Sequence, residues 1–329
     1  MATSIANFGD TSNVELTILV DNHTDQLVES TASVKRFTDA PLFAEPGFAA
    51  LVHLKDSGTR ILWDAGYSVI ALLANLRQMK IDPATINQIA LSHGDDDHTT
   101  AVTEILKAMN LKPQSRQWNA DATLETMREW ADGRRVSIIA HPAAFRERWI
   151  LRDDGTRRGP LPIPSRDEWQ ALGGQVVLSE GPYQLAPGVC TTGAIPRRSF
   201  ETAGVSRFLY YREANSFIKD QMDDDQALVL NIRGKGLVVL SGCAHAGIVN
   251  TINYAREMSG VERVHAIIGG FHLGRAQAEY IQKTIAAIEQ IKPGLVSPSH
   301  CSGFNAATQF AAQLPDAFIQ SLAGTTFVL

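Results

Sequence analysis

The segment LSHGDDDHTT, residues 91–100, places four potential metal ligands within six positions. They are His93, Asp95, Asp97 and His98. A strand that ends at Ser92 would release the chain into a tight loop at a sheet edge, where the four side chains converge. Imidazole and carboxylate together suit a divalent transition metal, and a catalytic site needs about three protein ligands plus an exchangeable water. The alternative is a solvated acidic turn whose histidines cap a helix.

Four more potential ligands lie in the last third of the chain, just after predicted strands. They are Cys243, His245, His272 and His300. Small residues surround them, as in SGCAHAG and SPSHCSG, which indicates loops at the strand ends. Such loops are expected to gather on one edge of a sheet. Any single histidine among them fits a structural role, but together they favour a metal site.

The elements that must position these residues are short strands alternating with helices. Apolar runs of strand length recur at 14–20, 49–54, 60–64, 88–92, 136–140, 175–179, 227–232, 236–241 and 264–268. Apolar residues spaced by three and four positions predict helices at 68–79, 100–109 and 277–292. The glycine-containing turn after 227–232 predicts an antiparallel hairpin. This mixture favours an α/β protein whose sheets have helices packed outside them.

The composition is that of an ordinary globular protein, with 44% of the 329 residues hydrophobic and 20% charged. The net charge of −5 comes without a long run of one sign, so we expect a small-molecule substrate and no nucleic-acid or membrane partner. No secretory signal and no run of roughly 18 apolar residues is found, which predicts a cytoplasmic protein. The three cysteines are odd in number and far apart, as is typical of reduced thiols.

The length fits one large α/β domain, and we predict a single domain over residues 1–329. Region 112–172 is a candidate insertion or lid within it, because its stretch 152–169 is rich in proline, glycine and arginine. A plain surface insertion explains the same composition equally well. The sequence leaves the oligomeric state open, and a homodimer is compatible with it.

Four phrases carry a resemblance to a known family. They are ILWDAG (61–66), LSHGDDDH (91–98), SGCAHAG (241–247) and SPSHCSG (297–303). Their order and spacing resemble the metallo-β-lactamase-fold superfamily. The longer phrases GLVVLSGCAHAGIVNTI and IIGGFHL are similar to the branch named after dihydropterin-methyl-ribofuranosylaminobenzene-phosphate synthase. The resemblance covers most of the chain and implies an αββα sandwich with metals at the edge where the loops meet.

Carried over by position, the resemblance implies two metal sites. His93 and Asp95 would bind the first metal, and Asp97, His98 and His300 the second. Cys243 stands where the superfamily usually has an aspartate that bridges both ions. His245, two residues later, is the substitute ligand for the first metal, while His272 is either a ligand or an acid facing the substrate. Asp64, in ILWDAG, matches a position that holds ligand histidines through hydrogen bonds; a turn aspartate at a strand end is the alternative.

Asp95 stands where the superfamily pattern normally has histidine. A carboxylate there adds an oxygen donor and a negative charge, which favours harder ions such as Mn or Fe(II) relative to an all-histidine site. A bound water is then acidified less than in a three-histidine zinc site. We expect two divalent ions, zinc or manganese; the alternative is a weakened first site and a protein that works with one metal.

The chemistry expected of such a site is hydrolysis of a small molecule by a metal-activated water, with an ester, lactone, phosphoester or activated carbon centre as the target. His272 or His245 would shuttle a proton and Asp97 would orient the water. Candidate substrate-binding residues are Asp21 and Asn22, which end the first strand, and Arg197 and Arg198, whose guanidinium groups suit anions.

Two further functions fit the same sequence. A synthase or transferase would agree with the name of the branch. A protein that binds metal or ligand without catalysis would keep the fold alone. For Arg197 and Arg198, solvated surface arginines are the alternative to a role in substrate binding.

Overall fold

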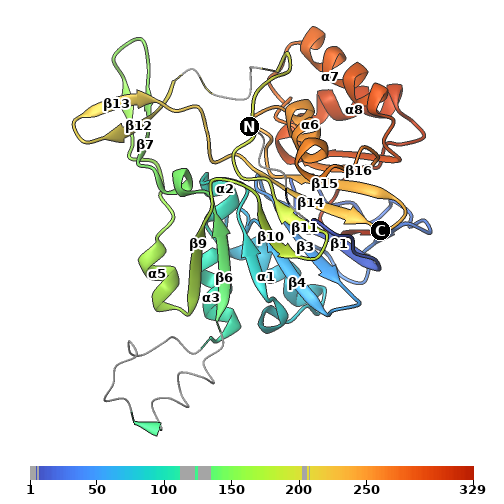
Figure 1. Cartoon of the computed structure of the whole chain (residues 1–329), viewed down its shortest axis with the longest axis horizontal. Coiled ribbons are helices and arrows are strands. Elements are labelled where there is room, and N and C mark those ends of the chain that lie inside the picture. The colour runs from blue at the N-terminus through green and yellow to red at the C-terminus, as the bar shows by residue number, and fades with distance from the viewer. Residues whose placement is uncertain (1–4, 6, 112–122, 125–134, 202–205, 207) are drawn as a thin grey trace.

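The computed structural model describes residues 5, 7–111, 123–124, 135–201, 206 and 208–329 (Figure 1). Two β-sheets pack face to face, and helices cover the outer face of each (Figure 1). The fold is therefore the αββα sandwich that the sequence predicts. No helix in these described ranges is both long and apolar enough to cross a bilayer.

The first sheet has eight strands in the order β2-β18-β1-β3-β4-β5-β6-β9. Their bounds are β1 Val14–Val20, β2 Val34–Arg36, β3 Ala49–Leu54, β4 Thr59–Trp63, β5 Gln88–Ala90, β6 Val136–Ala140, β9 Gly174–Leu178 and β18 Thr325–Val328. The helices that pack on its outer face are α1 Val69–Gln78, α3 Val102–Met109 and α5 Arg166–Ala171. Strands β4, β5, β6 and β9 run parallel, so their carboxyl ends meet at one edge.

The second sheet has six strands in the order β10-β11-β14-β15-β16-β17. Their bounds are β10 Tyr183–Ala186, β11 Val189–Thr191, β14 Ala227–Ile232, β15 Gly236–Ser241, β16 Val264–Gly270 and β17 Leu295–Ser299. The helices on its outer face are α6 Ile248–Ser259, α7 Ala278–Ile291 and α8 Gly303–Gln313. Strands β14 and β15 form the predicted antiparallel hairpin, whereas β15, β16 and β17 run parallel.

The space between the two sheets is the main apolar core. Leu16 and Ile18 of β1 alternate with outward-facing neighbours and pack with Leu228 and Leu230 of β14 and with Val238 of β15. All five side chains are fully buried. Side chains of a strand alternate between its two faces, so every second residue of each strand faces the other sheet. The two-residue spacing of the apolar residues therefore determines which side chains form this core.

A third, four-stranded sheet stands beside the sandwich (Figure 1). We call it the accessory sheet, in the order β13-β12-β7-β8, with bounds β7 Arg148–Leu151, β8 Arg157–Arg158, β12 Leu209–Glu213 and β13 Ser216–Lys219. The predicted insertion 112–172 contributes β7 and β8 to this sheet, but β6 and α5 to the sandwich; its segments 112–122 and 125–134 lie outside the described residues. The assignment of 1–329 to one domain stays a prediction.

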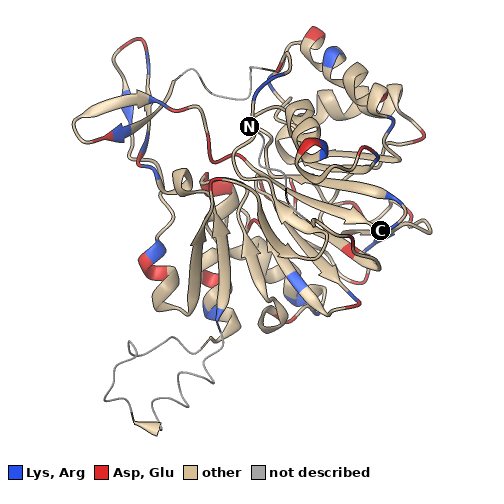
Figure 2. Cartoon of the chain, viewed as in Figure 1, with Lys and Arg blue, Asp and Glu red and all other residues tan. Residues whose placement is uncertain are grey.

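Short helical turns follow several strands at the shared edge. They are α2 Asp96–Thr99 after β5, η2 Pro142–Phe145 after β6 and η3 His300–Ser302 after β17; a further turn, η1 Pro83–Thr85, precedes β5. Acidic and basic residues are interspersed over the molecule, and α2 is acidic (Figure 2). The loops at the carboxyl ends of the parallel strands of both sheets therefore converge, and this edge carries the residues described next.

Candidate metal centre

Cys243 lies at the meeting point of two groups of potential metal ligands. The first, which we call the His98 group, consists of Asp97, His98, Cys243 and His300. The second, the His93 group, consists of His93, Cys243 and His245. Within each group all ligand atoms lie within 4.8 Å of one another. Cys243 Sγ therefore lies within reach of the other ligand atoms of both groups.

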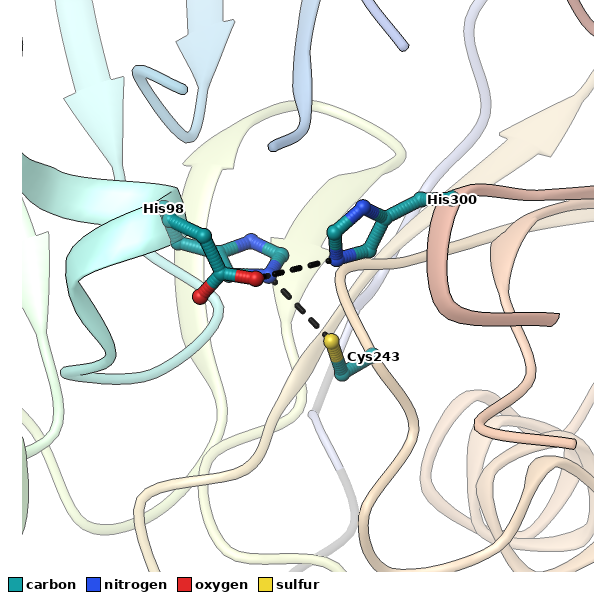
Figure 3. Close-up of side chains that lie close together, drawn as sticks. His98, Cys243 and His300 are labelled. Carbon is teal, nitrogen blue, oxygen red and sulfur yellow. Dashed lines mark hydrogen bonds and ion pairs between the residues drawn. The ribbon is translucent and has the colours of Figure 1, made fainter. Parts of the chain in front are cut away.

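The His98 group comes from three different loops (Figure 3). His98 Nε2 lies 3.2 Å from Cys243 Sγ, and His300 Nε2 lies 3.3 Å from Asp97 Oδ2. His98 belongs to α2, Cys243 follows β15, and His300 begins η3 after β17. Their side chains point toward one another, so residues distant in the chain form a compact set of nitrogen, sulfur and oxygen donors (Figure 3).

Asp64 orients the histidines of this edge. Its fully buried carboxylate accepts hydrogen bonds from the backbone N–H and the Oγ of Ser92, both at 2.7 Å, and lies 2.8 Å from His98 Nδ1. With Nδ1–H donating to Asp64, the Nε2 atom of His98 keeps its lone pair toward Cys243. Ser92 Oγ also lies 2.8 Å from Nδ1 of His93.

Asp95 places a carboxylate beside the His93 group. Its Oδ2 atom lies 3.5 Å from His93 Nε2 and 3.8 Å from His245 Nε2. Burial lowers the pKa of His93, but the charge of Asp95 and of other nearby carboxylates outweighs it and raises that pKa to about 10. The negative charge gathered around these imidazoles is what a bound cation would neutralise.

The residues present fit a metal. The Nε2 atoms of His93 and His300 are buried and have no hydrogen-bond partner in the part of the chain that the structure describes, although buried polar atoms are almost always paired. Each faces a carboxylate oxygen, of Asp95 and Asp97 respectively, at a distance that a shared cation can bridge. Imidazole, carboxylate and thiolate together suit zinc and related divalent ions.

A cavity of about 940 Å³ opens above these groups. His245, His272, His300 and Cys301 line it, together with residues of the accessory sheet. His272 has its ring centroid 4.3 Å from that of His245. The cavity is of the size that a small-molecule substrate needs.

The predicted substrate-binding residues lie elsewhere. Asp21 and Asn22 are not in the cavity lining; they hold His300, whose N–H donates to Asp21 Oδ1 at 3.0 Å and whose carbonyl accepts from Asn22 Nδ2 at 3.2 Å. Arg197 donates to the Gln221 carbonyl, and Arg198 pairs with exposed Glu257 at 2.7 Å. The structure therefore gives Asp21 and Asn22 a positioning role and does not bring Arg197 or Arg198 to the cavity.

Residues that the sequence prediction omitted complete this edge. They are Arg146, Arg148, Arg158, Asp220, Asp224, Arg275 and Cys301. Cys301 is adjacent to His300, and a third potential ligand group consists of Cys243, His272 and Cys301. Asp224 lies in the acidic run before β14, which was a usable signal; nothing in the local sequence of Arg148 marks it.

Comparison with known proteins agrees with this architecture. The sequence model described as "Metallo-beta-lactamase superfamily" matches residues 43–187. The chain is 28% identical to 7,8-dihydropterin-6-methyl-4-(beta-D-ribofuranosyl)-aminobenzene-5'-phosphate synthase of Methanocaldococcus jannaschii, over 97% of this chain and 98% of that protein. A second protein of the same organism, MJ0448, is 26% identical over 87% of this chain and 92% of its own length.

Solved structures share the fold. The crystal structure of Tm1679, described as a metal-dependent hydrolase of the β-lactamase superfamily, has a TM-score of 0.70 and 20% identity, with 96% of this chain and 99% of that chain covered. Zn²⁺-bound PqqB from Methylobacterium extorquens has a TM-score of 0.50 and 12% identity, with 96% and 100% covered. With the αββα sandwich and the ligand groups on its edge, these matches show that the chain has the metallo-β-lactamase fold.

Proposed function

We propose that this protein is a metal-dependent hydrolase that acts on a small molecule carrying an anionic group. The observation that carries the proposal is the arrangement of two ligand groups around Cys243 at the wall of a cavity of about 940 Å³. The residues of both groups lie on loops that follow strands of both sheets. Catalytic sites of layered α/β folds commonly lie at this position.

The ligand assignment follows from the two groups. His93, Asp95, Cys243 and His245 would hold one divalent ion, zinc or manganese, and Asp97, His98, Cys243 and His300 a second. Such ions, when bound, acidify water and stabilise developing negative charge. Among the chain's own residues, Asp97 orients the attacking water, and His272, which lines the cavity beside His245, donates a proton to the leaving group.

Two arginines support an anionic substrate. Arg158 of β8 and Arg275, which follows β16, both line the cavity, and guanidinium groups bind phosphate and carboxylate through paired hydrogen bonds. The named relative from Methanocaldococcus jannaschii has a 5'-phosphate in its product name, which agrees with this substrate class.

The test begins with metal content. Elemental analysis of the purified protein should give about two equivalents of metal per chain, and His98→Ala should lose at least one. His53→Ala, a histidine of β3 outside the ligand groups, is the matched control and should keep both. Phosphomonoesters, phosphodiesters, carboxylic esters and lactones are then assayed with zinc and with manganese. Metal-free wild-type protein, or no metal-dependent turnover of any of these classes, contradicts the proposal.

A synthase is the second candidate, because the relative that is 28% identical over 97% of this chain is named a synthase. The same metal groups would then serve an acceptor other than water. Turnover in ¹⁸O-labelled water separates the two functions, since hydrolysis places solvent oxygen in the product and group transfer to another acceptor does not.

A further inference from the structure

Arg148 is a buried guanidinium beside the metal groups. It begins β7 of the accessory sheet and is only 3% exposed. Its Nε atom donates to Asp220 Oδ2 at 2.9 Å and its Nη2 atom to Asp224 Oδ1 at 2.5 Å. The remaining nitrogen, Nη1, has no hydrogen-bond partner among the described residues and lies 3.5 Å from Asp95 Oδ1. Two of its nitrogens are thus anchored while the third faces the Asp95 carboxylate.

The two oxygens of Asp95 face in different directions. Oδ1 faces Arg148, whereas Oδ2 faces the Nε2 atoms of His93 and His245. Only one oxygen therefore points to the His93 group. A carboxylate held by a guanidinium on one oxygen offers the other as a single donor, as an imidazole offers one nitrogen.

One anchor of Arg148, Asp224, is tied to the loop that carries Asp95, and the other, Asp220, is tied to its own segment. Asp224 Oδ2 accepts the backbone N–H of Gly94 at 2.8 Å, and Asp220 Oδ1 accepts that of Met222 at 2.7 Å. Gly94 packs closely against Ala144, because a Cβ at Gly94 would lie 2.1 Å from the Ala144 carbonyl oxygen. Through Asp224, the guanidinium is therefore held relative to the backbone N–H of Gly94, next to Asp95.

The positive charge of Arg148 offsets the negative charge that Asp95 adds. An aspartate in place of a neutral histidine adds one negative charge to the His93 group, and the nearby guanidinium opposes that charge. The Nη1 atom of Arg148, 3.5 Å from Asp95 Oδ1, supplies this opposing charge at short range. Removal of the guanidinium would leave Asp95 with its added charge and without a fixed orientation.

We propose that Arg148 is a positioning residue for the metal centre, and that the Asp95–Arg148 pair takes the place of a single histidine ligand. The proposal rests on the proposed metal-dependent function. It also gives the accessory sheet a role in the chemistry, because β7 supplies the guanidinium and the segment after β13 supplies its two anchors.

A double-mutant cycle on metal affinity tests the proposal. Zinc binding is measured by competition with a chromogenic chelator for wild type, Arg148→Met, Asp95→His and the double variant. We expect Arg148→Met alone to weaken binding of one equivalent by about 10- to 100-fold and to leave the other unchanged. In the Asp95→His background the same change should have no effect or strengthen binding, because a cation beside a metal with a neutral ligand is unfavourable.

Two further variants separate positioning from a purely structural role. Arg146→Met removes a neighbouring arginine that also lines the cavity. Among the described residues, Arg146 forms ion pairs with Asp220, at 3.5 Å, and with Asp223, and none with Asp95. This variant should keep wild-type zinc affinity. Arg148→Lys keeps the charge without the fork and should lie between wild type and Arg148→Met; it also serves as the test variant if Arg148→Met does not fold, as judged by thermal melting.

The outcomes are distinct for the two proposals. Equal losses from Arg148→Met in both backgrounds mean that Arg148 acts independently of Asp95, which overturns this inference alone. No turnover of any substrate, with the cycle as expected, overturns the hydrolase function alone. Wild-type protein that binds no zinc and no manganese overturns both.

Discussion

Cys243 Sγ lies 3.2 Å from His98 Nε2 and belongs to both ligand groups of the metal centre. A donor shared by two ions would need more than one lone pair on the side facing them, and a thiolate sulfur has several on a single atom. The thiol is buried, and contact with Cys301 and the surrounding carboxylates adds to the effect of burial in raising its pKa. Bound cations are therefore needed to hold it as a thiolate.

Replacing Cys243 should change which metals bind. Cys243→Ser leaves a weak neutral donor, and we expect loss of about one equivalent of zinc. Cys243→Asp restores an anionic donor and should bind two equivalents, with a lower preference for cadmium over manganese than wild type. Elemental analysis after equilibration with each metal gives the comparison. A serine variant that retains two tightly bound ions is incompatible with a bridging role.

Asp64→Asn should weaken the His98 group without touching a ligand. The amide can present its NH₂ group to His98 Nδ1, which then loses its acceptor, and the Nε2 lone pair is no longer held toward Cys243. We expect a loss of about 10- to 100-fold in the affinity of one metal equivalent. Asp56→Asn, an exposed aspartate bonded to Ser12 and Asn13, is the control and should bind metal as wild type does. Equal affinities in the two variants would contradict the role of Asp64.

Glu201 predicts a pH-dependent stability unrelated to the metal groups. Its buried carboxylate accepts the backbone N–H groups of Val249 and Asn250 at the start of α6, at 2.8 and 3.0 Å. Burial raises its pKa from 4.5 to about 7 in spite of these bonds. The unfolded chain ionises first as the pH rises, so the folded state binds more protons between about pH 4.5 and 7 and loses stability there, by up to about 3 kcal/mol.

Urea denaturation of wild type and Glu201→Gln at pH 5 and pH 7.5 measures this effect. The glutamine carbonyl can still accept one of the α6 N–H groups and has no charge to bury. We expect the free energy of unfolding of the variant, relative to wild type, to be higher at pH 7.5 than at pH 5. If the free energies of unfolding of variant and wild type differ by the same amount at pH 5 and pH 7.5, Glu201 does not ionise in this range.

The elements of the sandwich are predictable from the sequence because their signals are local. The helix predicted at 277–292 is α7, Ala278–Ile291, and its buried Ile281, Ile285 and Ile288 are the residues whose spacing predicted it. Strands β1, β3, β6, β14 and β15 have the predicted bounds. In each case the spacing of apolar side chains within one element indicates both its type, helix or strand, and the face that is buried.

The candidate site was predictable where ligands stand in one short phrase or directly follow predicted strands, as Cys243, His245, His272 and His300 do. His93 to His98 lie within one loop, and their clustering is visible without a fold. Arg148 reaches Asp95 only because β7 pairs with β12, with Trp149 opposite Tyr210, in a sheet joined by distant segments. Conversely, Arg197 follows β11 closely in sequence, yet its guanidinium turns to the Gln221 carbonyl. Long-range strand pairing is not encoded in local periodicity.

We expect Arg158 and Arg275 to bind the anionic group of the substrate. Both line the cavity, and loss of a guanidinium that binds a phosphate or carboxylate in the ground and transition states raises KM and leaves kcat nearly unchanged. We expect Arg158→Ala and Arg275→Ala each to raise KM by about 10-fold for an anionic substrate and to leave a neutral substrate of the same reaction class unaffected.

Arg157→Ala is a matched control for this prediction, because it removes the adjacent guanidinium of β8. Arg157 is not in the cavity lining and lies over the Phe217 ring at 5.7 Å. Steady-state kinetics on one anionic and one neutral substrate, for all three variants, gives the comparison. Neighbouring residues of one strand point their side chains to opposite faces, so a specific contact in the cavity would involve Arg158 and not Arg157. If Arg157→Ala raises KM as much as Arg158→Ala does, the effect arises from the overall charge of the accessory sheet.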